Sequence, residues 1–152
     1  MTTPIRTLIH KDLEYRIPET LNNGRYRVTG VLARGGMGIL YTAMDTRLHD
    51  KKVLIKSILY KPSLFQHKND TAREEQIGEL REQLRREKVT LQYLLERNIG
   101  SVPILLDAFE DFNPMLYGPH KDETTGELFT CEQHSAHDPF LVLSYIDGTP
   151  VS

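Results

Sequence analysis

Apolar and polar residues along the chain follow two spacings, one typical of strands and one typical of a helix. Strand-like patterns rich in Val, Ile, Leu and Tyr occupy 25–33, 39–46 and 51–60. Because short turns separate these segments, they are expected to pair as an antiparallel meander. Two further apolar stretches, 102–111 and 139–148, are predicted to form the fourth and fifth strands.

Between the third and fourth predicted strands, the apolar spacing becomes that of an amphipathic helix. From about Thr71 to Asn98, apolar residues recur at i, i+3, i+4 and i+7. Asn98 and Gly100 are typical of a helix end. A coiled coil is the alternative, but the short stripe favours packing on the chain's own sheet, with the first half of the helix open to a partner. The stripe consists of Ile77, Leu80, Leu84, Leu91, Leu94 and Leu95.

The order of three strands, one helix and two strands predicts an α+β domain, in which a five-stranded antiparallel sheet carries one long helix. Residues 1–24 end in the turn-like Asn22-Asn23-Gly24 and are interpreted as an N-terminal extension. Residues 112–139 are rich in Pro, Gly and polar residues, so they are interpreted as an inserted loop or ragged hairpin, either disordered or a docking surface.

Composition narrows the setting in which the chain acts. Its 152 residues suffice for one domain or one lobe of a larger domain. A net charge of −2 gives no electrostatic reason to expect nucleic acid or an anionic membrane as partner. The single cysteine, Cys131, excludes an internal disulfide and favours a reducing cytoplasm. The sequence contains neither an apolar run as long as a membrane span nor a secretion signal.

The turn between the first two predicted strands is unusually rich in glycine: residues 33–40 read ARGGMGIL. Glycines let backbone N–H groups approach a phosphate because no Cβ intervenes. The segment lies between two strands, whereas a P-loop and a Rossmann turn both open a helix. A phosphate-binding hairpin is therefore one interpretation, and a flexible hairpin tip is the other.

Two charged residues fall on faces that are otherwise apolar. Lys56 shares a strand face with Leu54 and Ile58, where an unpaired ammonium is costly. Glu87 lies about 40° from the centre of the helical apolar stripe, where a carboxylate needs a cationic partner. Each residue alone could be a solvated side chain at a border. Together they predict an ion pair between the third strand and the helix.

These motifs, in this order, resemble the N-terminal lobe of a protein kinase. A glycine-rich hairpin, a lysine in strand three, a glutamate in the next helix and LVLSYIDG at 141–148 all stand at suitable spacing. The GGMG stretch followed by an aliphatic pair and Tyr is most similar to bacterial Ser/Thr kinases of eukaryotic type. The resemblance covers 25–152 and implies a kinase-like lobe that ends at the hinge, in a signalling transferase that moves the γ-phosphate of ATP to protein Ser/Thr hydroxyls.

The resemblance also implies a role for each matching residue. Lys56 matches the lysine that contacts the α- and β-phosphates, and Glu87 matches the glutamate that holds it. Leu32 and Leu40 match the residues that sandwich the adenine, Leu143 the gatekeeper, and Ser144 and Ile146 the hinge. The full ATP-binding set that the resemblance implies is Leu32, Ala33, Gly35, Gly36, Met37, Gly38, Leu40, Leu54, Lys56, Leu143, Ser144 and Ile146.

Several features depart from the kinase pattern. Ala33 replaces the first glycine of the loop, Leu54 replaces a small residue that packs on adenine, and Ser144 replaces a common acid at the hinge. The H-R-D, D-F-G and A-P-E motifs do not occur in these residues. The catalytic base and the Mg²⁺ ligands are expected in a C-terminal lobe after Ser152, so this chain alone is expected to be inactive.

Two other functions fit the same residues. A pseudokinase-like docking or regulatory module would keep the shape without phosphoryl transfer, and a small-molecule kinase could share the fold. Apolar surface meant for a second lobe predicts self-association, while the protein substrate is not predicted. Cys131, His134 and His137, with His120 upstream, are zinc-type ligands, but their spacing matches no common zinc module, so no metal site is assigned.

Overall fold

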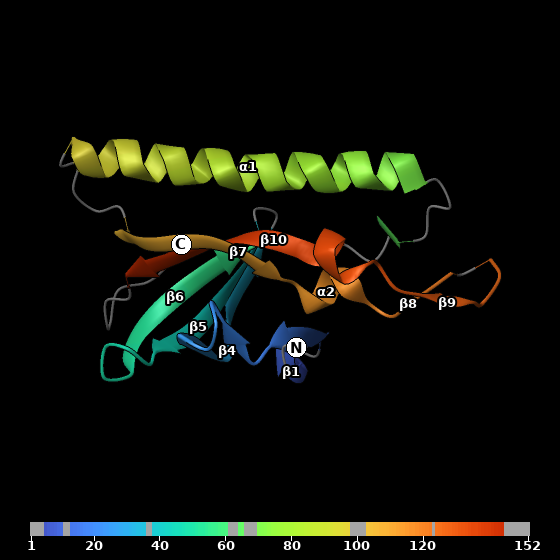
Figure 1. Cartoon of the computed structure of the whole chain (residues 1–152), viewed down its shortest axis with the longest axis horizontal. Helices are drawn as coiled ribbons and strands as arrows, with labels where there is room; N and C mark the ends of the chain where they lie inside the picture. The colour runs from blue at the N-terminus through green and yellow to red at the C-terminus, as the bar shows by residue number, and fades with distance from the viewer. Residues whose placement is uncertain are drawn as a thin grey trace.

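The computed structural model describes residues 5–10, 13–35, 38–60, 64–65, 70–97, 103–122 and 124–144. One long helix lies over a curved sheet, and smaller hairpins flank the sheet (Figure 1). In chain order the elements are β1 Ile5–His10, β2 Leu13–Pro18, β3 Thr20–Leu21, β4 Tyr26–Gly35, β5 Gly38–Asp45, β6 Lys51–Ser57, α1 Asp70–Glu96, β7 Leu105–Phe112, α2 Pro114–Tyr117, β8 His120–Lys121, β9 Leu128–Phe129, the 3₁₀ helix η2 Gln133–Ala136 and β10 His137–Ser144.

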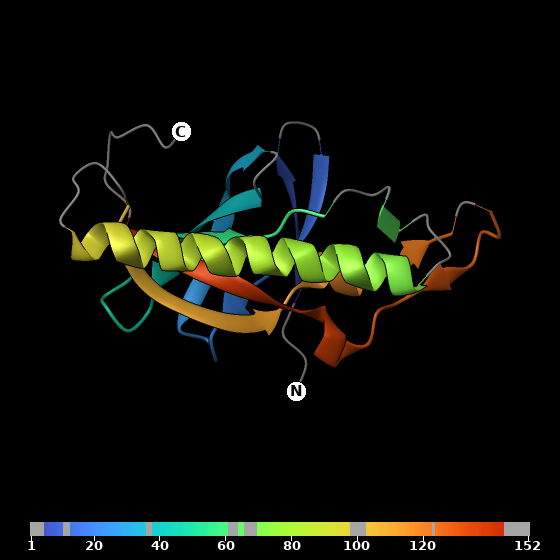
Figure 2. The ribbon, with the colours of Figure 1, turned by 90° about the horizontal axis from the view of Figure 1, so that it is seen from above.

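The main sheet has six antiparallel strands in the order β3-β4-β5-β6-β10-β7. Strands β1 and β2 form a separate hairpin, and β8 and β9 form another. Helix α1 runs across one face of the main sheet, as the two perpendicular views show (Figures 1 and 2). This order places β6 in the middle of the sheet, under the helix, with β5 on one side and β10 on the other.

Side-chain alternation along the strands gives the sheet two apolar faces. Toward α1, Leu54 and Leu141 pack in one buried cluster with the helix residues Ile77, Leu84 and Leu91. This contact confirms the predicted amphipathic helix. The opposite face forms a second buried cluster, which consists of Tyr15, Ile17, Leu21, Tyr26, Val28, Ile39, Tyr41, Ala43, Val53, Ile55, Phe140 and Val142.

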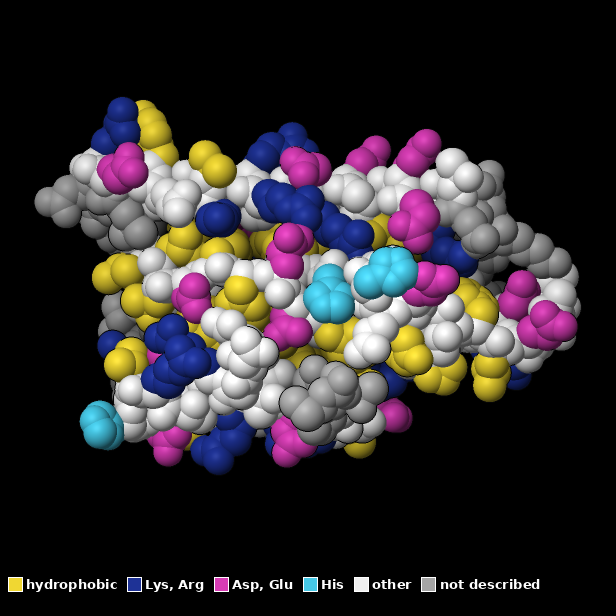
Figure 3. Space-filling model, viewed as in Figure 1, with side chains coloured by type: hydrophobic (Ala, Val, Ile, Leu, Met, Phe, Trp, Pro, Cys, Tyr) yellow, Lys and Arg dark blue, Asp and Glu magenta, His cyan; other side chains and the backbone are white. Residues whose placement is uncertain are grey.

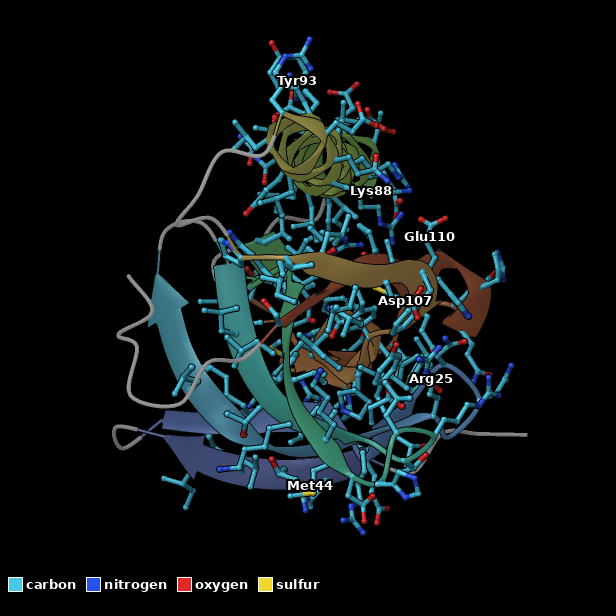
Figure 4. The ribbon with its side chains drawn as sticks, turned by 90° about the vertical axis from the view of Figure 1, so that its left-hand side faces the viewer. Arg25, Met44, Lys88, Tyr93, Asp107 and Glu110 are labelled. Carbon is cyan, nitrogen blue, oxygen red and sulfur yellow. The ribbon has the colours of Figure 1, made fainter. Side chains whose placement is uncertain are left out.

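The sheet curls until its two edges meet, and side chains hold the seam. Tyr26 on β4 donates its hydroxyl hydrogen to the Asp107 Oδ2 on β7 at 2.8 Å. The backbone N–H of Asn22, just after β3, donates to the Asp111 Oδ2 at 2.8 Å. The Tyr26 ring also stacks on Phe109, with centroids 5.7 Å apart. Figure 4 shows Asp107 and the neighbouring Arg25 on the same side of the molecule, at this seam.

The predicted kinase-like lobe with a five-stranded sheet is therefore wrong. The main sheet has six strands and is nearly closed into a barrel, and two further hairpins accompany it. The sixth strand, β3, belongs to the part of the chain interpreted as an extension. The seam joins residues about eighty positions apart, such as Tyr26 and Asp107. Contacts of that range leave no periodic signal in the sequence.

Both the predicted extension, 1–24, and the predicted insertion, 112–139, contribute to the core. Within 1–24, Tyr15, Ile17 and Leu21 are buried against the sheet. Within 112–139, Leu116 of α2 and Ala136 of η2 are fully buried in the cluster under α1. Both segments are integral parts of the fold.

Among the described residues, no helix has the length and apolar character needed to cross a membrane. The long helix α1 carries many charges on its outer surface instead. Figure 3 shows Lys and Arg side chains next to Asp and Glu side chains along it.

Candidate functional site

The strongest candidate site is built around an ion pair between the sheet and the long helix. The Lys56 Nζ lies 2.6 Å from the Glu87 Oε1. The Lys56 side chain is 16% exposed and that of Glu87 is 31% exposed, so the pair is half-buried but reachable from solvent. The structure thus contains the ion pair that two charges on apolar faces predicted.

Strand pairing fixes the position of Lys56. In the middle of the sheet, Lys56 pairs with Leu40 on β5 and with Leu141 on β10. Because side chains alternate along a strand, Lys56 projects toward α1 together with Leu54. On the helix, Glu87 lies about one turn after the buried Leu84, so it also faces the sheet.

The glycine-rich hairpin reaches the same place. Gly35 at the end of β4 pairs with Gly38 at the start of β5, while Gly36 and Met37 lie outside the described residues. Gly38 has a φ of +132°, and a Cβ built on it would lie 2.5 Å from the carbonyl oxygen of Ser57 and 3.8 Å from the Lys56 Cε. The missing side chain therefore lets the hairpin come close to the end of β6, beside Lys56.

A small cavity separates the hairpin from the helix. Its volume is about 50 Å³, enough for a few waters or a similarly small polar group. Binding pockets for whole small molecules are several times larger, about 300 Å³ or more. The cavity therefore has room only for a small group beside the ion pair. It is lined by Gly38, Ser57, Ile58, Leu59, Leu80, Gln83, Leu84 and Glu87.

The described residues that the resemblance placed around adenine lie on β4, β5, β6 and β10. Leu54 pairs across the sheet with Leu143, and both are buried in the cluster under α1. Leu40 packs partly against this cluster, and Leu32 is 38% exposed. The large Leu54 side chain is thus part of the buried core.

Ser144 lies at the end of β10 and is tied to the segment before β7. Its backbone N–H donates to the Ile104 carbonyl oxygen at 2.9 Å, and its Oγ accepts from the Ile104 N–H at 3.0 Å. The resemblance assigns backbone C=O and N–H groups of the hinge to the adenine edge, and the Ser144 N–H is already used by Ile104. For Ala33 and Gly35 the structure gives the backbone in β4, and Ile146 lies outside the described residues.

Sequence reasoning missed a second polar site under the same helix. Asp138 of β10 is fully buried and accepts hydrogen bonds from Arg81, Tyr60 and Asn113. Burial and the nearby Asp138 carboxylate raise the pKa of Tyr60 well above its usual value. Burial alone would lower the pKa of Arg81, but its hydrogen bond to Asp138 and the charge of that carboxylate outweigh this and raise it. A carboxylate at the start of a strongly apolar strand was the available signal.

The zinc-type residues occupy different environments. His120 is buried, and its ring stacks on Phe65 with the ring centroids 3.6 Å apart. Its Nε2–H donates to the Leu116 carbonyl oxygen. Burial lowers the pKa of His120. His134 and His137 are exposed. In the part of the chain that the structure describes, no group of three or more His, Cys, Asp or Glu is placed to hold a metal ion.

Comparisons of the chain with protein-family models, with curated proteins and with solved structures found no match.

Proposed function

We propose that this chain binds the phosphates of ATP at Lys56 and serves as the ATP-binding part of a Ser/Thr protein kinase. The observation that carries the proposal is the 2.6 Å contact between the Lys56 Nζ and the Glu87 Oε1, directly beside the glycine hairpin. The support comes from this geometry and from the order of the motifs. It does not come from the fold, whose six-stranded sheet differs from the lobe expected from the sequence.

The ion pair is suited to phosphate binding because Glu87 occupies only part of the ammonium group. Lys56 keeps further N–H donors for phosphate oxygens, and the carboxylate holds the side chain in one direction. The hairpin adds backbone close to the ammonium, since Gly38 carries no Cβ and can approach Ser57 and Lys56 closely. A phosphate group at the hairpin end of β6 would thus meet a cation and a glycine hairpin together.

The nucleoside end would lie toward β10. Leu32 and Leu40 offer apolar surface on the two strands of the glycine hairpin, and Ser144 ends the strand that borders β6. Mg²⁺ would enter as part of the Mg-ATP substrate. Among the described residues we assign no ligand to it, because Glu87, the one carboxylate lining the cavity, already pairs with Lys56.

Transfer of the γ-phosphate needs groups beyond those in this site. The motifs that supply a catalytic base and metal ligands do not occur among the 152 residues, so the proposed contribution of this chain is to bind and orient ATP. The proposal places the chain in the cytoplasm, consistent with a single cysteine, Cys131.

The test is a calorimetric titration of the chain with Mg-ATP. Lys56→Met is expected to weaken binding at least about tenfold, because a charge-assisted hydrogen bond to phosphate is lost. Lys51→Met removes an exposed lysine from the same strand and is the matched control, with unchanged affinity expected.

Two outcomes would overturn the proposal. The first is a wild-type chain that does not bind Mg-ATP, and the second is equal affinity in wild type and Lys56→Met. Either one would favour a docking or regulatory module that does not use nucleotide. Circular dichroism of each variant shows whether the fold is retained.

A further inference from the structure

A buried charge network holds the long helix to the sheet near the candidate site. The Asp138 side chain has no exposed surface. Its carboxylate accepts from the Arg81 Nε at 2.8 Å, from the Tyr60 hydroxyl at 2.8 Å and from the Asn113 Nδ2 at 2.7 Å. Arg81 also donates to the carbonyl oxygen of Ser135 in η2. The network therefore joins α1, β10, the residues after β6 and the segment 112–137.

Arg81 and Glu87 lie on the same helix and contact neighbouring strands. They are six residues apart, which is about 9 Å along a helix. Arg81 reaches β10 through Asp138, whereas Glu87 reaches β6 through Lys56, and these two strands pair with each other. Two directional charge contacts thus fix one helix on one pair of strands.

Two other kinds of contact made by α1 are less directional. The packing of Ile77, Leu84 and Leu91 on the sheet is apolar and without direction. The pair between Arg85 and Glu110 is exposed, so it adds little. A charge-assisted hydrogen bond between buried groups has a defined length and direction.

We propose that Arg81 and Asp138 are positioning residues, which set the placement of α1 so that Glu87 meets Lys56. The segment 112–137 takes part through Asn113 and Ser135, so a displacement of this segment would reach the ion pair through the helix. The consequence for nucleotide binding rests on the proposed function, whereas the consequence for the ion pair does not.

The test measures the coupling between Lys56 and Glu87 without any ligand. Urea unfolding of Lys56→Met, Glu87→Gln and the double variant gives the factor by which the pair changes the unfolding equilibrium. In the otherwise wild-type chain this factor is expected to be at least about threefold. In an Arg81→Met background it is expected to fall to about one.

The matched control repeats the cycle in an Arg85→Met background, where the coupling is expected to stay at its wild-type value. If Arg81→Met does not fold, Arg81→Lys provides the same readout, because a lysine cannot contact both Asp138 and Ser135 as the guanidinium does. A Lys56–Glu87 coupling that is equal with and without Arg81 would overturn the proposal.

A second readout uses Mg-ATP titrations of the same variants. Arg81→Met is expected to weaken binding severalfold in the wild-type chain and to have no further effect in Glu87→Gln, because it acts through that carboxylate. Equal losses in both backgrounds would contradict this route. If the wild-type chain does not bind Mg-ATP, the proposed function fails, while the unfolding cycle still tests the positioning role.

Discussion

Asp138→Ala is expected to destabilise the chain by about 3–5 kcal/mol, the usual cost of removing one partner from a buried ion pair. Asp138 is fully buried and Arg81 is mostly buried, so the guanidinium would remain without its carboxylate. The Tyr60 hydroxyl and the Asn113 amide would lose an acceptor as well. Whole domains are stable by only about 5–15 kcal/mol, so this loss is large.

Urea unfolding followed by circular dichroism measures this effect. The matched control is Glu110→Gln, which removes a carboxylate that also pairs with α1 but is 55% exposed. The control is expected to change the free energy of unfolding by less than about 1 kcal/mol. Equal effects of the two substitutions would show that the Asp138 network does not hold the helix.

Gly38→Ala is expected to destabilise the chain by about 1–3 kcal/mol and to weaken Mg-ATP binding. The φ of +132° is one that side chains rarely adopt, and the new Cβ would lie 2.5 Å from the Ser57 carbonyl oxygen. That oxygen is a backbone atom of Ser57, which pairs with Ile39 on β5. It therefore cannot move without disturbing the β5–β6 pairing. Gly38 would be displaced from Lys56.

Gly78→Ala is the matched control for this substitution. Gly78 lies inside α1, and a Cβ there would meet nothing within 4 Å. Because glycine is a poor helix former, the control is expected to stabilise the chain by up to about 1 kcal/mol. The control is expected to leave Mg-ATP affinity unchanged. If Gly38→Ala changed neither stability nor Mg-ATP affinity, the close approach at Gly38 would have no role in binding.

Local patterns in the sequence were sufficient to predict the parts of the fold that surround the candidate site. The strands β4, β5, β6, β7 and β10 and the helix α1 follow from their own local patterns. The Lys56–Glu87 contact follows from two charges placed on apolar faces, since each is costly without the other. In these places local sequence and tertiary structure agree.

The sixth strand and the closure of the sheet depend on contacts between distant residues, which is why they were not predicted. Strand β3 has only two residues, and the seam of the barrel needs Tyr26 to meet Asp107 and Phe109. The Asp138 network likewise joins four separate segments. A single polar residue in an apolar strand shows that a partner is needed, but not which partner.

The outward residues in the second half of α1 differ from the apolar residues that face the sheet. Tyr93 points away from the sheet (Figure 4) and is 50% exposed, and Val89 is 62% exposed. The guanidinium of Arg97 lies over the Tyr93 ring at 3.7 Å. The helix thus uses one side for the ion pair and leaves the other in solvent.

The most direct test of ATP binding at Lys56 is an amide NMR titration of the ¹⁵N-labelled chain with Mg-ATP. The account predicts that the largest shifts occur at Gly38, Lys56 and Ser57, and that these shifts disappear in Lys56→Met. No shifts in the wild-type chain, or shifts confined to residues far from the hairpin such as Tyr93, would contradict it.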